Sequence, residues 1–168
     1  MNLVLIGMPA SGKSTTGVLL ARSLGMGFVD TDLLIQEKEG RLLQEIIDAE
    51  GNPYFKKVEE YVLRTLDTDD MVISTGGSAI YYPKAMEHLK EGAVVLYLEN
   101  SFPVIDKRLQ NLSSRGVTLE PGQTLEDLYN SRIPLYEKYA DITVNTDKMD
   151  IEETVSHIVK MVKEKLQK

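Results

Sequence analysis

The feature that most constrains this chain is a glycine-bounded loop near its start, which reads GMPASGKS over residues 7–14. An apolar run at residues 3–6 precedes the loop, and a segment with a helical pattern follows it at residues 15–24. The loop matches the pattern G-x-x-x-x-G-K-[ST], which carries weight when a strand precedes it and a helix follows it. In that setting the backbone N–H groups form a concave site for anions. The sequence therefore predicts a site for a nucleoside triphosphate.

Each residue type in this loop has a chemical task. Gly7 and Gly12 allow backbone conformations that a side chain would block. Lys13 can reach the β- and γ-phosphates, and Ser14 can offer its hydroxyl to Mg²⁺. A glycine-rich turn with a solvated lysine is the structural alternative. We expect ATP and Mg²⁺ as cofactors, with the nucleotide contacted by Gly7, Ala10, Ser11, Gly12, Lys13, Ser14 and Thr15.

Charge and composition disfavour several functional classes. The net charge of −7 argues against a nucleic-acid binder, which needs a basic face. Without cysteine the chain has no disulfide framework and no thiolate zinc site. No stretch approaches the roughly 20 apolar residues of a membrane span, and the N-terminus lacks the layout of a signal peptide. We therefore expect a cytoplasmic monomer that acts on a small molecule, without nucleic-acid or membrane partners.

Strand-like and helix-like segments alternate along the chain, as is typical of an α/β fold with a parallel sheet. Strands are predicted at residues 2–6, 27–30, 71–74, 93–98 and 141–144. Helices are predicted at residues 13–24, 33–39, 42–49, 53–66 (with Asn52 as N-cap), 83–91, 102–112, 124–139 and 151–166. Because no repeat, low-complexity segment or linker divides the chain, we predict a single domain over residues 1–168.

Polar residues follow the predicted strands at the edge where parallel sheets bind their ligands. Asp30 and Asp32 end the second strand, and a persisting strand would place both on one face. One carboxylate can hold the water shell of Mg²⁺, and the other can orient or deprotonate an attacking hydroxyl. The alternative is a pair of turn aspartates, one of which caps the next helix. Since no acidic residue ends the third strand, Asp30 is the favoured metal partner, with Ser74 in support.

The third predicted strand leads into the turn TGGS at residues 75–78. Glycines there let a ligand approach the backbone closely, although a plain glycine turn is the alternative. The segment 113–123 contains glycine and proline without a periodic pattern, so we predict a mobile loop. Its Arg115 can close over a transferring phosphoryl group. Arg108 can stack on a base. The alternative for each of Arg108, Arg132 and Lys56 is a charged side chain that is simply exposed to solvent on its helix.

Taken together, these residues resemble the shikimate kinase family, a branch of the nucleoside-monophosphate-kinase-like P-loop kinases. The matching pieces span essentially the whole chain: residues 7–15, 30–32 and 75–77, together with Phe55, Lys56, Glu59, Arg115, Arg132, Tyr136 and Ala140. The resemblance implies a three-layer P-loop NTPase fold whose five-stranded parallel sheet has the order 2-3-1-4-5 and is flanked by helices. It also implies a substrate-binding helical region at about residues 32–62 and a lid at about residues 113–123.

The resemblance further implies an ATP-dependent kinase that phosphorylates the 3-hydroxyl of shikimate in aromatic amino acid (chorismate) biosynthesis. The implied catalytic residues are Lys13 on the phosphates, Asp32 as base and Arg115 in the lid. The implied metal residues are Ser14 and Asp30, and Arg108 lies against adenine. The implied substrate-binding residues are Asp32, Lys56, Gly76, Gly77, Ser78 and Arg132.

The chain departs from the family's pattern mainly in its substrate half. Lys56 stands where the family usually has arginine, and lysine lacks the planar fork of a guanidinium. Ser78 replaces a third glycine and adds a side chain at a crowded position. In the lid, Arg-Pro-Leu-Leu is replaced by Arg-Gly-Val-Thr at residues 115–118, and Ala10 stands where glycine is common. Two alternatives stay open: a paralogous kinase for another small hydroxylated acid or polyol, and a non-catalytic nucleotide-binding module.

Overall fold

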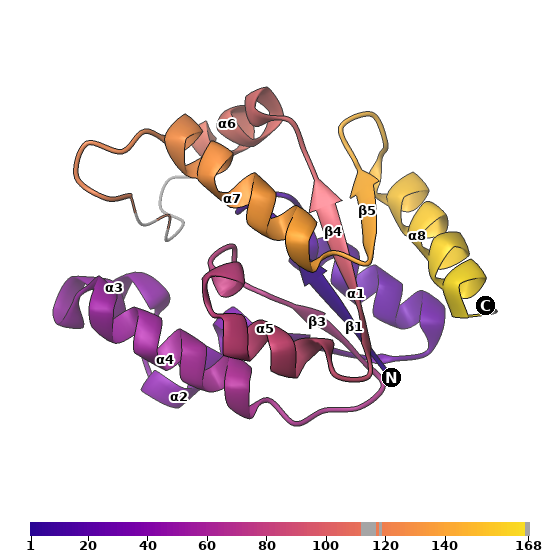
Figure 1. The fold of residues 1–168 in the computed structure, drawn as a ribbon, viewed down its shortest axis with the longest axis horizontal. Coiled ribbons are helices and arrows are strands. Elements are labelled where there is room, and N and C mark those ends of the chain that lie inside the picture. The colour runs from indigo at the N-terminus through magenta and orange to yellow at the C-terminus, as the bar shows by residue number, and fades with distance from the viewer. Residues whose placement is uncertain (112–116, 118, 167–168) are drawn as a thin grey trace.

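A five-stranded parallel sheet forms the centre of the computed structural model, which describes residues 1–111, 117 and 119–166. The strands run in the order β2-β3-β1-β4-β5, and every pairing is parallel (Figure 1). Their bounds are β1 Asn2–Ile6, β2 Gly27–Asp30, β3 Met71–Ser74, β4 Ala93–Glu99 and β5 Ile142–Asn145. The α/β fold class and the strand order predicted from the sequence are confirmed.

Helices connect the strands and flank the sheet. Their bounds are α1 Lys13–Leu24, α2 Thr31–Glu39, α3 Leu43–Glu50, α4 Asn52–Thr65, α5 Pro83–Lys90, α6 Phe102–Gln110, α7 Leu125–Tyr139 and α8 Ile151–Leu166. A short 3₁₀ helix, η1 Ala79–Tyr81, has no counterpart among the predicted elements. Among the described helices, none combines the length and the apolar character that a membrane span requires.

Four predicted helix starts, at residues 33, 42, 53 and 124, are wrong by one or two residues, because the helices begin at Thr31, Leu43, Asn52 and Leu125. Helix α2 begins at Thr31, because the Asp30 side chain caps it by accepting a hydrogen bond of 3.0 Å from the backbone N–H of Asp32. Helix α4 has Gly51 as its N-cap, so the predicted cap Asn52 is already helical. Within the predicted loop at 113–123, residues 113–116 and 118 lie outside the described residues, as does the predicted helix end at residue 112.

The two faces of the sheet bury separate cores, which follows from the alternation of side chains along each strand. On β1, Leu3 and Leu5 pack with residues of α1 and α8, such as Leu20 and Ile158. The intervening residues of β1 face the other core, which α5, α7 and the end of α4 cover (Figure 1). The sheet is therefore sandwiched between helical layers, and its central strand is buried on both sides.

A third, smaller core holds the helices between β2 and β3 together. It consists of residues from α2, α3 and α4, namely Ile35, Ile46, Phe55, Val58 and Val62. These helices project beside the sheet as a group (Figure 1) and correspond to the helical region predicted at about residues 32–62. The position of any side chain on α4 relative to the sheet thus depends on how this group packs.

Helix α1 offers a matched pair of substitutions that tests the packing of the core. Leu20 is fully buried against the sheet, whereas Val18 on the same helix is 50% exposed. Leu20→Ala should lower the free energy of unfolding by about 2–5 kcal/mol because it leaves a cavity. Val18→Ala should change it by no more than about 0.5 kcal/mol. Urea denaturation measures both, and equal effects of the two substitutions would contradict the packing described.

Candidate active site

The loop between β1 and α1 needs glycine at both of its ends. Gly7 has φ +150°, and a Cβ there would lie 2.7 Å from the carbonyl oxygen of Leu98 on β4. Gly12 has φ +88° and is the N-cap of α1. Its carbonyl oxygen accepts the first hydrogen bond of the helix, from the backbone N–H of Thr16 at 2.9 Å. The predicted phosphate-binding loop is therefore present as a strand–loop–helix unit.

Lys13 lies over this loop rather than in solvent. Its Nζ donates hydrogen bonds of 2.8 Å to the carbonyl oxygens of both Gly7 and Met8. It also lies 3.4 Å from the hydroxyl oxygen of Ser11. The ammonium group is thus held beside the backbone that would surround a phosphate, which excludes the alternative of a solvated lysine.

Ala10 carries backbone strain at the tip of the loop. Its φ of +63° lies in the left-handed region, where a Cβ costs about 1–2 kcal/mol. This explains physically why glycine suits the position. The carbonyl of Ala10 accepts a hydrogen bond of 3.0 Å from Nη1 of Arg108 on α6. Arg108 is therefore placed at the phosphate loop, while its stacking on adenine stays a prediction.

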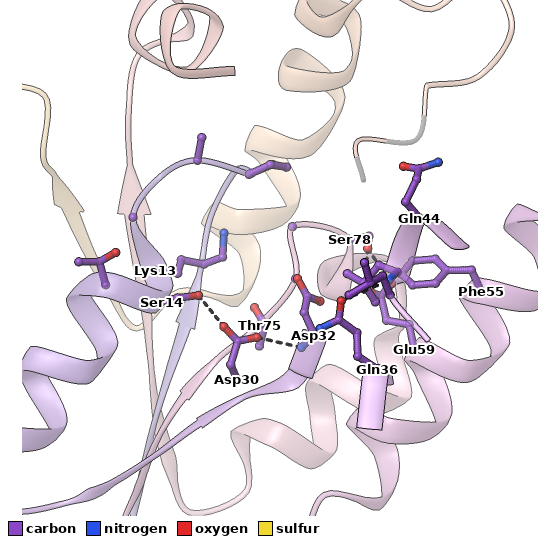
Figure 2. A pocket seen from close by; sticks show the side chains of 18 of the residues that line it. Lys13, Ser14, Asp30, Asp32, Gln36, Gln44, Phe55, Glu59, Thr75 and Ser78 are labelled. Atoms are coloured by element: carbon purple, nitrogen blue, oxygen red, sulfur yellow. Dashed lines mark hydrogen bonds between the residues drawn. The ribbon is translucent and has the colours of Figure 1, made fainter. Parts of the chain in front are cut away.

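Ser14 and Asp30, the predicted metal residues, lie side by side. The Ser14 hydroxyl donates a hydrogen bond of 2.6 Å to Asp30 Oδ2 (Figure 2). It also lies 3.2 Å from the hydroxyl of Ser74. The other oxygen of Asp30 caps α2, so the capping alternative describes this residue correctly. The expectation that a persisting strand would align Asp30 with Asp32 is wrong, because Asp32 belongs to α2.

This donor set suits Mg²⁺. A hydroxyl and a carboxylate next to a phosphate loop are protein ligands that Mg²⁺ accepts while it keeps several waters and takes substrate phosphate oxygens. Ser14 and Asp30 would hold the ion, directly or through water.

A cavity of about 520 Å³ extends from the phosphate loop to the helical region. It brings together predicted residues that are far apart in the sequence: Ala10, Gly12, Lys13, Ser14, Thr15, Asp30, Asp32, Gly76, Gly77, Ser78 and Arg132. Gly7 and Ser11 belong to the loop without lining the cavity, and Arg108 contacts the loop from α6. Arg115 lies outside the described residues.

Asp32 occupies the middle of this cavity in an environment that disfavours its charge. Burial raises the pKa of its carboxyl group to about 6, and the carboxylates of Glu59 and Asp30 add to the rise. Lys13 acts in the opposite direction. A carboxylate with a pKa near neutrality can accept a proton efficiently from a reacting hydroxyl, so the environment suits the predicted base.

Glu59 is a buried carboxylate that the sequence did not single out as a site residue. It is 2% exposed, and burial raises its pKa, although hydrogen bonds from Ser78 and Tyr82 oppose that rise. A Cβ on Gly76 would come within 2.9 Å of both Glu59 Oε2 and Asp32 Oδ1. The turn after β3 therefore needs glycine at this position because two carboxylates flank it.

Arg132 supplies a buried cation to the same cavity. It is 3% exposed, so the alternative of a solvated helix charge is wrong. Its Nε donates to the hydroxyl of Tyr81 at 3.3 Å, and its guanidinium lies 5.3 Å from the centre of that ring. A Cβ on Gly77 would meet Arg132 Nη1 at 2.8 Å. Gly77 also accepts a hydrogen bond of 2.7 Å from the hydroxyl of Tyr136, so α7 fixes the turn through two of its side chains.

Lys56 faces a neighbouring cavity of about 430 Å³ rather than the main one. Its half-exposed ammonium lies 3.8 Å from a carboxylate oxygen of Glu120. The two cavities share Phe55, Ser78 and Arg132, so Lys56 is near the acceptor end of the site without lining it. Its contact with substrate stays a prediction.

Several residues of the main cavity were not predicted as site residues from the sequence. They lie on or next to the helical region: Gln36, Leu42, Leu43, Gln44, Phe55 and Glu59. Figure 2 labels Gln36, Gln44, Phe55 and Glu59 among them. Glu59 and Phe55 entered only as matches to a family pattern. The others have no motif, because their direction depends on how α2, α3 and α4 pack together.

Comparisons with known proteins agree with this geometry. The family model described as shikimate kinase matches residues 9–163. A curated relative named shikimate kinase, from Actinobacillus pleuropneumoniae serotype 5b (strain L20), is 37% identical over 164 residues, which cover 96% of this chain and 95% of the relative.

Solved structures give the same result. The shikimate kinase from Acinetobacter baumannii, in complex with shikimate, aligns with a TM-score of 0.87 and 31% identity, covering 99% of this chain and 95% of the other. The shikimate kinase from Aquifex aeolicus aligns with a TM-score of 0.83 and 32% identity, covering 99% of each chain.

The strain at Ala10 can be tested by removing its Cβ. Ala10→Gly should raise the free energy of unfolding by about 0.5–1 kcal/mol, because relief of the left-handed conformation exceeds the added chain entropy. Ala21→Gly, in the middle of α1, is the matched control and should lower it by about 1 kcal/mol or more. Thermal and urea denaturation measure both. Destabilisation by Ala10→Gly would contradict the strain.

The raised pKa of Asp32 predicts an acid limb in the activity profile. A base must be ionised, so kcat/KM should fall about tenfold per pH unit as the pH drops below about 6. Asp32→Asn should remove this limb and lower kcat by about 10²–10⁴ with little change in ATP affinity. Steady-state kinetics between about pH 4.5 and 8.5 provide the measurement. A limb centred near the ordinary aspartate pKa would argue against a perturbed base.

Proposed function

Because the chain belongs to the shikimate kinase family, we propose that it transfers the γ-phosphoryl group of ATP to the 3-hydroxyl of shikimate. The family resemblance derived from the motifs is confirmed, and members of this family are ATP-dependent kinases that use Mg²⁺. One observation carries the proposal: a single cavity has a phosphate loop at one end and a buried Arg132 beside paired carboxylates at the other. This arrangement suits a nucleotide donor and a small acidic acceptor.

At the donor end, the phosphate loop and Lys13 hold the β- and γ-phosphates. Ser14 and Asp30 would hold Mg²⁺, which when bound would supply positive charge to the oxygens of the transferring group. Arg108, which donates from α6 to the carbonyl of Ala10, keeps the role expected from the sequence, contact with adenine. Arg115 keeps the role expected from the sequence, closure over the phosphates.

At the acceptor end, Arg132 binds the substrate carboxylate. A guanidinium suits this task because its planar donors match the two oxygens of a carboxylate. Gly76 and Gly77 let the acceptor lie close to the backbone of the turn after β3. Lys56 contributes long-range attraction from the neighbouring cavity.

Asp32 is the general base between the two ends. It accepts the proton of the attacking hydroxyl while a bond forms from that oxygen to the γ-phosphorus and the bond from phosphorus to the β,γ-bridging oxygen breaks. The products are ADP and the phosphate ester of the acceptor. Catalysis relies on positioning and on stabilisation of charge, as in other phosphoryl transfers.

We also propose a compartment, an oligomeric state and a domain organisation for the enzyme. It acts as a monomer in the cytoplasm, the compartment in which ATP and Mg²⁺ are plentiful. Its net charge of −7 disfavours nucleic acid as a partner. The domain is a single kinase unit whose substrate-binding part is the α2–α4 region and whose lid covers about residues 113–123.

A coupled assay of ADP release tests the proposal. ATP and Mg²⁺ with shikimate should give turnover that a control without acceptor lacks, and Lys13→Ala should abolish it because the phosphates lose their cation. Stimulation by another small hydroxy acid or polyol, but not by shikimate, would favour a paralogous kinase. ATP binding without stimulation by any acceptor would favour a non-catalytic module.

A further inference from the structure

Ser78 lies at the junction of the two cavities and lines both of them. Its hydroxyl does not simply crowd the turn, as the sequence suggested. It donates to the carboxylate of Glu59, at 2.6 Å from Oε1 and 2.8 Å from Oε2. Tyr82, at the end of η1, donates a second hydrogen bond to Oε1 at 2.7 Å. The carboxylate of Glu59 is thus held from one side by hydroxyl donors.

These hydrogen bonds orient the carboxylate of Glu59, and so they determine in which direction its oxygens can accept a further hydrogen bond. Oε1 accepts from both hydroxyls, whereas Oε2 has only the Ser78 hydroxyl beside it, at 2.8 Å, and lies next to Gly76 together with Asp32 Oδ1. Two carboxylate oxygens from different helices therefore flank the same glycine of the cavity wall. Hydrogen bonds to the charged form also favour ionisation of a buried carboxylate, which burial alone would disfavour.

The positively charged side chains near Glu59 do not hold its carboxylate in place of the Ser78 and Tyr82 hydroxyls. Arg132 and Lys56 favour its charge from a distance, but Arg132 contacts Tyr81 and Tyr136, and Lys56 contacts Glu120. Ser78 and Tyr82 are the groups that touch the carboxylate. A substitution at Ser78 should therefore act through Glu59.

We propose that Ser78 is a positioning and specificity-determining residue, which holds Glu59 as a second acceptor of substrate hydroxyl groups beside Asp32. The inference rests on the proposed function and deepens it. Two flanking carboxylates select small acids with neighbouring hydroxyls, because a site built to bind a hydroxyl rejects an analogue that lacks it.

Kinetics of Ser78→Ala test the proposal. Loss of a hydrogen bond to a charged group should raise KM for shikimate about tenfold, with kcat and KM for ATP changed less than about threefold. Ser78→Thr keeps the hydroxyl and should restore KM for shikimate. Analogues of shikimate that each lack one hydroxyl should be rejected less strongly by Ser78→Ala than by the unsubstituted enzyme.

A double-mutant cycle shows whether Ser78 acts through Glu59. In a Glu59→Gln background, Ser78→Ala should add little to the rise in KM. Tyr54→Phe is the matched control. Tyr54 is on α4, as Glu59 is, and its exposed hydroxyl donates a hydrogen bond of 3.0 Å to Glu39. Removal of this hydroxyl should leave the kinetics unchanged. Tyr82→Phe removes the other donor and carries the test if Ser78→Ala fails to fold.

The outcomes separate the inference from the proposed function. Unchanged KM in Ser78→Ala, additive effects with Glu59→Gln, or a parallel loss of kcat and ATP affinity would each overturn the role of Ser78 while shikimate kinase activity stands. Absence of shikimate-dependent turnover in the unsubstituted enzyme would overturn the proposed function, and the inference with it.

Discussion

Parallel hydrogen bonding of β1 between β3 and β4 is the constraint on which the site depends. The register places Leu5 opposite Ser74, and Ser74 opposite Asp30 on β2. The ends of these strands are therefore level, and the loop that follows β1 starts in the middle of the edge. Ser14 meets Asp30 and Ser74 at this point because sheet pairing, not local sequence, brings the segments together.

Charge is distributed unevenly around this edge. The carboxylates of Asp30, Asp32 and Glu59 line the cavity close to one another. The cations Lys13 and Arg132 lie at its opposite ends. Burial raises the pKa of Asp32 to about 6, so its ionised form is disfavoured in the fold by comparison with an exposed aspartate. A site that tolerates this cost is typical of catalytic machinery rather than of a stabilising ion pair.

The acceptor half of the cavity depends on a separate piece of packing. Its walls come from α2, α3 and α4, which share a core of their own beside the sheet, and from α7, which reaches the turn after β3 through Arg132 and Tyr136. The donor half is built on the central strand. Substrate specificity can therefore change through the helices while the nucleotide site stays constant, which fits the location of Lys56 on α4. Ser78 acts on the same half from the turn after β3, through Glu59 of α4.

What the sequence by itself determined were features that depend on short-range order: the phosphate loop, the strands and helices with bounds close to those observed, and the residues that follow each strand. The strand order came from the family resemblance that these motifs carry. Tertiary structure alone decided that Ser14 meets Asp30, that Lys56 turns towards Glu120, and that Ser78 holds a buried Glu59. The physical reason is that loop and helix signals lie within a few residues of chain, whereas the partner of a side chain is set by packing between elements distant in sequence.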